Sequence, residues 1–142
     1  MSIFTEKELE FMASQRLGRL ATVDPKGQPQ NAPVGFNYNP DLDVIEIGGG
    51  GMGKSKKYRN IATNNHVSFV LDDVLPPWNV RGLEIRGIAE QVVTGGKDIF
   101  GNRGNGRDYW DDSYIRITPT QIIGWGIDTD PYHPNNRKVS KR

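Results

Sequence analysis

The sequence predicts a mainly β protein: an antiparallel β-barrel, closed or split, with six to seven strands and two or three short helices. Three observations indicate this class. The 142 residues include 17 glycines and 9 prolines, which favours short elements joined by many turns. Short runs of β-branched and aromatic residues lie between those turns. Successive strands are joined by hairpins rather than by helical crossovers, and closure into a barrel removes the exposed sheet edges.

The N-terminal half is predicted to hold a helix followed by a hairpin. Thr5 and Glu8 form a capping-box pattern, so a short helix begins after Thr5. Strands at 18–23 and 30–38 flank the sequence Asp24-Pro25-Lys26-Gly27, which has strong turn chemistry. The elements expected next are a strand at 43–47, a helix at 55–63 and a strand at 66–71.

The C-terminal half is predicted to hold further strands. Two consecutive prolines indicate an irregular loop at 74–80, and this loop carries Trp78. Alternating apolar residues predict a long strand at 83–90. The remaining expected elements are two short strands at 114–117 and 121–125, and a polar tail at 128–142 in which we expect little order. A chain of this length forms one domain, residues 1–142.

Composition excludes several classes of function. The chain has no cysteine, which rules out disulfides, thiolate metal sites and cysteine nucleophiles, and no metal-ligand spacing is present. Its net charge is +1, so no general attraction to nucleic acid is expected. No stretch approaches the roughly 18 apolar residues of a membrane span, and the N-terminus does not resemble a signal peptide. We expect a soluble, cytoplasmic protein with no membrane partner.

One segment matches the P-loop pattern of nucleotide-binding enzymes. Residues 48–55 read GGGGMGKS, follow a predicted strand and precede a predicted helix. A P-loop enzyme needs a parallel sheet with helical crossovers, and the pattern beyond residue 80 is strand and turn only, so we reject that interpretation. Glycine backbone and a basic helix start still favour an anion here. A mobile glycine loop followed by a solvated basic helix face remains the alternative.

Several segments, in this order, resemble a known superfamily. Residues 18–23 (GRLATV), 27–34 (GQPQNAPV) and 56–61 (KKYRNI) are together similar to the pyridoxamine-phosphate-oxidase-like split β-barrel superfamily. Residues 78–87 (WNVRGLEIRG) resemble its coenzyme F420-dependent branch, in the subgroup that includes a dehydrotetracycline reductase. The resemblance covers roughly residues 5 to 125. It implies a split β-barrel and a homodimer with a cofactor at each subunit interface.

The resemblance also implies which residues bind the cofactor. Asn31, Ala32, Pro33 and Val34 are expected to line one side of the ring system, and Gly48, Gly49 and Gly50 to pass its other edge. Lys57 and Asn60 are expected at the phosphate.

Further positions are expected around these. Lys54, Ser55 and Lys56 are candidates for the phosphate or for the acidic polyglutamate tail of F420. Trp78 is expected to cover the ring or the substrate across the interface. The alternatives are that Trp78 packs in a satellite core under its loop, and that Asn31 and Pro33 are ordinary edge-strand residues.

The function implied is that of an F420-dependent oxidoreductase. It would transfer hydride between the reduced deazaflavin and a small organic substrate such as an enone, a quinone or a polycyclic ketone. Two alternatives stay open: an FMN-binding or haem-associated member of the same superfamily, and a cofactor-binding or carrier protein without catalysis.

Overall fold

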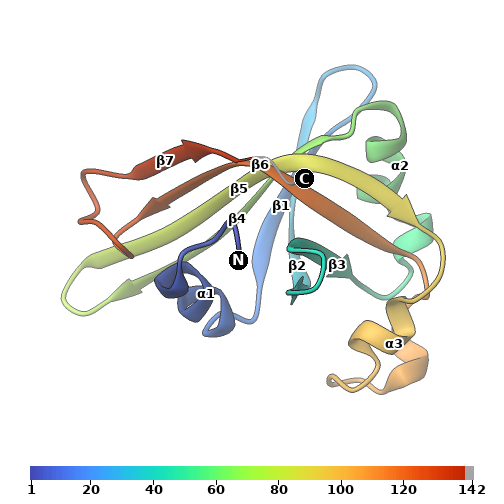
Figure 1. Cartoon of the computed structure of the whole chain (residues 1–142). Coiled ribbons are helices and arrows are strands. Elements are labelled where there is room, and N and C mark those ends of the chain that lie inside the picture. Colours follow the sequence, from blue (N-terminus) through green and yellow to red (C-terminus); the bar gives the residue numbers. More distant parts are fainter. Residues whose placement is uncertain (140–142) are drawn as a thin grey trace.

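Seven antiparallel strands form one sheet in the order β3-β2-β1-β4-β5-β6-β7, and β3 also pairs with β6 (Figure 1). This computed structural model describes residues 1–139. The β3–β6 pairing closes six strands into a barrel and leaves β7 outside it. The strands are β1 Gly18–Val23, β2 Pro29–Asn39, β3 Val44–Gly48, β4 His66–Leu75, β5 Asn79–Val92, β6 Tyr114–Trp125 and β7 Asn135–Lys138. The predicted mainly β barrel is confirmed.

Five short helices complete the described residues: α1 Glu6–Ala13, η1 Met52–Lys54, α2 Lys56–Thr63, α3 Gly96–Phe100 and η2 Arg107–Tyr109. The capping box predicted for the first helix is present, because Thr5 accepts from the Glu8 amide and the Glu8 side chain accepts from the Thr5 amide. Ser55 is the N-cap of α2, and its hydroxyl accepts from the Tyr58 amide. None of the helices within residues 1–139 is long and apolar enough to span a membrane.

The hydrophobic core fills the barrel interior. Five of the six barrel strands contribute fully buried side chains, which include Leu20, Ile45, Ile47, Phe69, Leu71, Leu83, Ile85, Ile115, Ile117 and Ile122. The sixth strand, β2, contributes the nearly buried Val34 and Phe36. β3 is antiparallel to both of its neighbours, β2 and β6. A P-loop strand lies in a parallel sheet, so this topology agrees with the rejection of the nucleotide-binding interpretation.

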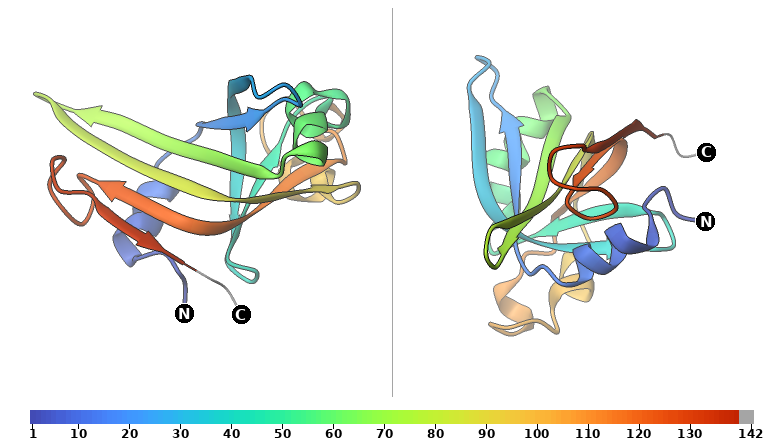
Figure 2. Two further views of the ribbon diagram at one scale, coloured as in Figure 1. Left: turned by 90° about the horizontal axis from the view of Figure 1, so that it is seen from above. Right: turned by 90° about the vertical axis from the view of Figure 1, so that its left-hand side faces the viewer.

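Two predictions about the second half of the chain were wrong. The irregular loop expected at 74–80 is a tight turn, because β4 and β5 stay paired as far as Leu75 and Asn79. The strands expected at 114–117 and 121–125 are one strand, β6. The proline that suggested a break, Pro119, lies opposite Gly87 where the β5–β6 register shifts, and such an irregularity tolerates a residue without an amide hydrogen. The resulting long strands extend away from α2, as Figure 2 shows.

The C-terminal tail is more ordered than the sequence predicted. β7 pairs with β6, and from it Arg137 reaches back across the fold to the first helix. Its guanidinium donates to both carboxylate oxygens of Glu8, at 2.6 and 3.0 Å, and to the Ile3 carbonyl at 2.9 Å. Glu8 is only 1% exposed. The ion pair therefore fastens the tail to α1; positions 140–142 of the predicted tail lie outside the described residues.

Candidate functional site

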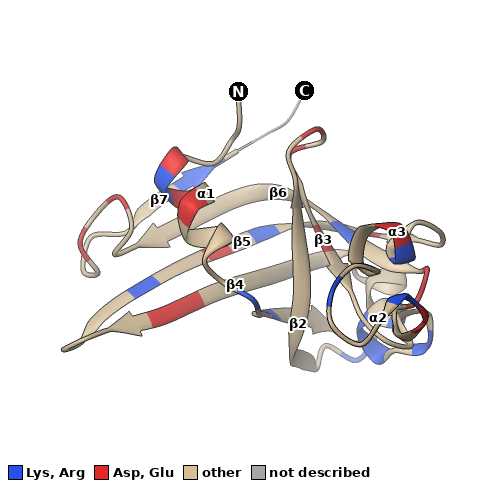
Figure 3. Cartoon of the chain, turned by 90° about the horizontal axis from the view of Figure 1, so that it is seen from below, with Lys and Arg blue, Asp and Glu red and all other residues tan. Residues whose placement is uncertain are grey.

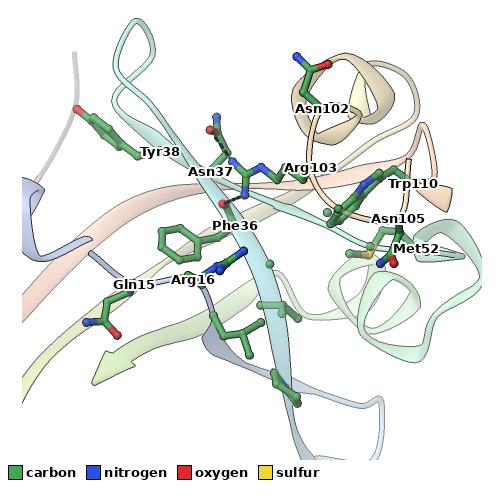
Figure 4. Close-up of a pocket in the computed structure, with 18 of the residues that line it drawn as sticks. Gln15, Arg16, Phe36, Asn37, Tyr38, Met52, Asn102, Arg103, Asn105 and Trp110 are labelled. Carbon is green, nitrogen blue, oxygen red and sulfur yellow. Dashed lines mark hydrogen bonds between the residues drawn. The ribbon is translucent and has the colours of Figure 1, made fainter. Parts of the chain in front are cut away.

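A cavity of about 1260 Å³ lies beside the outer part of β2 (Figure 4). Its walls come from α1 and the loop after it, from β2, from the glycine segment that follows β3, from α2 and from residues 102–110. Small-molecule pockets usually measure roughly 300 to 1,000 Å³. This cavity therefore has room for a cofactor and a small substrate together.

The charged residues that line the cavity are all basic. Arg16, Lys57 and Arg103 contribute cationic groups, and no aspartate or glutamate is among the lining residues, which all lie within positions 1–139. The chain as a whole has nearly equal numbers of acidic and basic residues. The cavity thus departs from the average charge of the protein, and its field favours an anionic ligand.

Lys57 lies in the first turn of α2 and is half-buried. Burial lowers the pKa of its ammonium group, and among residues 1–139 no hydrogen bond or neighbouring carboxylate offsets this effect. The start of a helix also presents unpaired amide groups, which attract anions. Figure 3 shows the basic residues gathered on α2. Lys57 is therefore an uncompensated cation placed to meet a phosphate or carboxylate.

The glycine strip, residues 48–50, is covered by aromatic side chains. A Cβ at Gly48 would lie 2.4 Å from the Phe100 ring, and one at Gly50 would lie 2.9 Å from the Tyr109 ring. The Gly49 carbonyl accepts from the Asp111 amide at 3.0 Å. Position 48 therefore requires glycine for packing against the buried Phe100 ring, and position 50 lies close against the Tyr109 ring.

The structure brings together six of the thirteen predicted site residues. Those that line the cavity are Pro33, Val34, Gly48, Gly49, Gly50 and Lys57. The others do not line it: Asn31, Ala32, Lys54, Ser55, Lys56, Asn60 and Trp78. For all thirteen positions a role in cofactor binding stays a prediction.

Four of these seven have an identified place elsewhere, and one of them is Lys56, whose ammonium group lies 3.9 Å from the Asp24 carboxylate. Asn60, 3% exposed, donates to Thr22 Oγ1 at 3.0 Å and to Gln30 Oε1 at 3.1 Å, so it fastens α2 to β1 and β2. Ser55 caps α2 and donates to the Met52 carbonyl. Trp78 lies in the turn between β4 and β5 and is 73% exposed, so it does not pack in a satellite core of its own chain.

Sequence reasoning named no site residue in the segment after α3. Residues 102–110 supply five lining residues with functional groups, namely Asn102, Arg103, Asn105, Tyr109 and Trp110. Trp110 stacks on Phe100 with the ring centroids 5.2 Å apart, and its indole nitrogen has no hydrogen-bond partner among residues 1–139. The only signal in the sequence was an arginine and an aromatic pair within a polar, glycine-rich stretch. Within residues 1–139, no group of three histidine, aspartate or glutamate side chains is placed to hold a metal ion.

Comparisons with known proteins agree with this architecture. The model of the family described as pyridoxamine 5'-phosphate oxidase matches residues 4–126. A relative from Streptomyces rimosus, named 5a,11a-dehydrotetracycline/5a,11a-dehydrooxytetracycline reductase, is 43% identical over 129 residues, which cover 89% of this chain and 86% of the relative.

Two solved structures share the fold. General Stress Protein 26 from Bacillus anthracis superposes with a TM-score of 0.71 at 23% identity, covering 94% of this chain and 97% of the other. The FAD binding protein from Mycobacterium smegmatis has a TM-score of 0.61 at 22% identity, covering 87% and 96%. The resemblance predicted from the sequence is confirmed by the family model and by the reductase. The chain therefore belongs to the pyridoxamine 5'-phosphate oxidase family.

Proposed function

We propose that this protein is a coenzyme F420-dependent oxidoreductase that reduces or oxidises a small organic substrate. The observation that carries the proposal is the cavity with three cationic side chains and no carboxylate among its lining residues. Such a cavity suits a cofactor that carries a phosphate and an acidic tail. The reductase from Streptomyces rimosus, at 43% identity, supports oxidoreductase chemistry in this family.

The residues of this chain fit such a cofactor. Lys57 would meet the phosphate, with the start of α2 beside it. The glycine strip, Pro33 and Val34 would lie along the ring system. Asn60 is already bonded to Thr22 and Gln30, so its part is to hold α2, and with it Lys57, against the barrel. When bound, the deazaflavin supplies the hydride, and the protein binds, orients and excludes water.

The proposal includes a cytoplasmic homodimer. Trp78 is 73% exposed and shares the β4–β5 turn region with the exposed side chains of Val74 and Leu75. Large apolar groups clustered at an exposed tip are typical of an interaction site. A second copy of the chain would cover this tip, and Trp78 would then lie over the partner's cavity.

FMN is the alternative cofactor, because the same cations suit its phosphate equally well. Titration of the purified protein with F420 and with FMN, followed by fluorescence, separates the two. We expect tight binding of F420 and oxidation of reduced F420 in the presence of an enone, a quinone or a polycyclic ketone. Tight binding of FMN without binding of F420 would overturn the proposal.

The variant Lys57→Ala tests the phosphate contact. A hydrogen bond to a charged group contributes roughly 1.5 to 3 kcal/mol, so F420 affinity should fall about 10- to 140-fold. Lys26→Ala is the matched control, because Lys26 is exposed in the β1–β2 turn and does not line the cavity. Equal affinity of the wild type and Lys57→Ala would remove Lys57 from the site.

A further inference from the structure

We infer that Arg103 binds an anionic oxygen, a carboxylate or an enolate, on a planar substrate, and that Asn37 and Glu46 hold its guanidinium in place. This inference rests on the proposed function, and it names the class of substrate. Arg103 belongs to the segment between α3 and η2, a part of the cavity that the cofactor contacts predicted from the sequence do not include.

Three contacts fix the Arg103 guanidinium, and Figure 4 shows the two hydrogen bonds among them. One terminal nitrogen donates to the Phe36 carbonyl at 2.6 Å, and the other donates to Asn37 Oδ1 at 3.1 Å. The guanidinium also lies 4.9 Å from the centroid of the Phe100 ring. A guanidinium has five N–H donors, and these two hydrogen bonds use only two of them. The group is therefore held in position with donors left for a ligand.

The charge of Arg103 is not neutralised by an acidic neighbour. No carboxylate within residues 1–139 forms an ion pair with it, and burial lowers the pKa of its guanidinium. Arg107, four residues later at the start of η2, differs because it is paired with Asp98 at 2.7 Å. Arg103 is an exposed cation on the cavity wall, so its unpaired charge is available to an anionic ligand.

A buried carboxylate orients the side chain that holds Arg103. Glu46 is 2% exposed, and it accepts from Asn37 Nδ2 at 2.8 Å and from Asn39 Nδ2 at 3.1 Å. Because a guanidinium can only donate, the oxygen of Asn37 must face Arg103, and its amide nitrogen then faces Glu46. Glu46 and Asn37 are therefore positioning residues for the guanidinium.

The surroundings of Arg103 suit a planar molecule. Phe36 and Val34 on β2 and Met12 on α1 form apolar walls of the same cavity, and Trp110 adds a large flat ring. Arg16, from the loop after α1, adds a second cation. With Lys57 assigned to the cofactor phosphate, two arginines remain for a further anionic group. A planar substrate with a delocalised negative charge matches both the walls and the cations.

A matched pair of ligands tests the inference. Anthraquinone-2-carboxylate and anthraquinone-2-carboxamide have nearly the same shape and differ in charge. Isothermal titration calorimetry on the whole protein, without cofactor and again with F420, measures their affinities without requiring turnover. We expect the wild type to bind the carboxylate at least about 10-fold more tightly than the amide, as a hydrogen bond to a charged group implies. The result therefore stays informative even if the protein does not use F420.

Variants identify the residue responsible. In Arg103→Gln the preference for the carboxylate should disappear, whereas Arg103→Lys should keep part of it because the charge is retained. Asn37→Leu, which removes the support of the guanidinium, should reduce the preference several-fold. Arg107→Gln, four residues further along in η2, is the matched control and should keep the preference in full. Urea denaturation of each variant confirms that it is folded.

Three results would overturn the inference. The wild type could bind both ligands equally, or Arg103→Gln could keep the preference. A loss of F420 affinity in Arg103→Gln as large as that in Lys57→Ala would assign Arg103 to the acidic tail of the cofactor instead of to the substrate. Lys57→Ala should show the reverse pattern, with weaker F420 binding and an unchanged preference for the carboxylate.

Discussion

Replacing Gly48 with alanine tests how tightly the glycine strip is packed against the cavity wall. The added Cβ would lie 2.4 Å from two carbons of the Phe100 ring, whereas carbon atoms in contact are roughly 3.5 to 4.0 Å apart. The ring would have to move by more than about 1 Å. Phe100 is fully buried and stacks on Trp110, so the strain passes to a residue that lines the cavity.

Overpacking of this kind costs roughly 1 to 3 kcal/mol, and we expect Gly48→Ala to lower the free energy of unfolding by about 2 kcal/mol. Urea denaturation followed by tryptophan fluorescence measures it. Gly104→Ala is the matched control, because no atom lies within 4 Å of its added Cβ, and its stability should change by less than about 0.5 kcal/mol. In a Phe100→Leu background, Gly48→Ala should cost less than in the wild type.

The reasoning would be refuted if Gly48→Ala were as stable as the wild type. Unchanged stability would mean that Phe100 adapts freely and that the aromatic cover does not restrict position 48. F420 affinity provides a second readout. It should fall in Gly48→Ala together with stability, because Trp110 and the glycine strip line the same cavity.

Three further predictions concern single side chains. Arg137→Ala leaves the buried carboxylate of Glu8 without its ion pair and should lower the free energy of unfolding by roughly 3 to 5 kcal/mol in urea denaturation; a loss below 1 kcal/mol would contradict this. Burial lowers the pKa of Lys57 in the folded protein below its unfolded value of 10.5. Between these two pKa values the unfolded chain binds more protons than the folded protein, so the free energy of unfolding of the wild type should rise with pH in that range. Lys57→Met should lack this rise, be more stable than the wild type at neutral pH and bind F420 weakly. The Gly53 amide donates to Asp111 and holds the pKa of that carboxyl below 3.8 in the folded protein. The stabilisation from ionised Asp111 is therefore present above pH 3.8 and is lost as the pH falls through the folded-state pKa. Asp111→Asn should show a shallower loss of stability in acid.

Elements with local signals could be predicted from the sequence. The capping box at Thr5 and the turn at 24–27 depend on residues a few positions apart, and both are present. β6 could not be predicted as one strand, because Pro119 is tolerated only through its pairing with Gly87 on another strand. The order of the tail depends on Arg137 meeting Glu8, which is 129 positions away in the sequence. Contacts between residues so far apart leave no recognisable pattern in a short stretch of sequence.

The candidate site divides in the same way. The glycine strip and Lys57 were predicted because a flexible backbone followed by a basic helix start is a local anion signal, and both line the cavity. Arg103 was missed because its partners, Phe36 and Asn37, lie 66 to 67 positions earlier. Asn60 fits the family pattern, yet its side chain is bonded to β1 and β2, which only the folded arrangement reveals.

The segment between β5 and β6 can vary independently of the barrel strands that flank it. It begins after Val92 and ends before Tyr114, which are paired with each other, so its length and sequence can vary while the strand register stays the same. It carries Arg103 and Trp110, whereas Lys57 and the glycine strip belong to the part of the chain between β3 and β4. Under the proposed roles, changes confined to this insertion would alter the choice of substrate and leave the barrel and the anion site proposed at α2 unchanged.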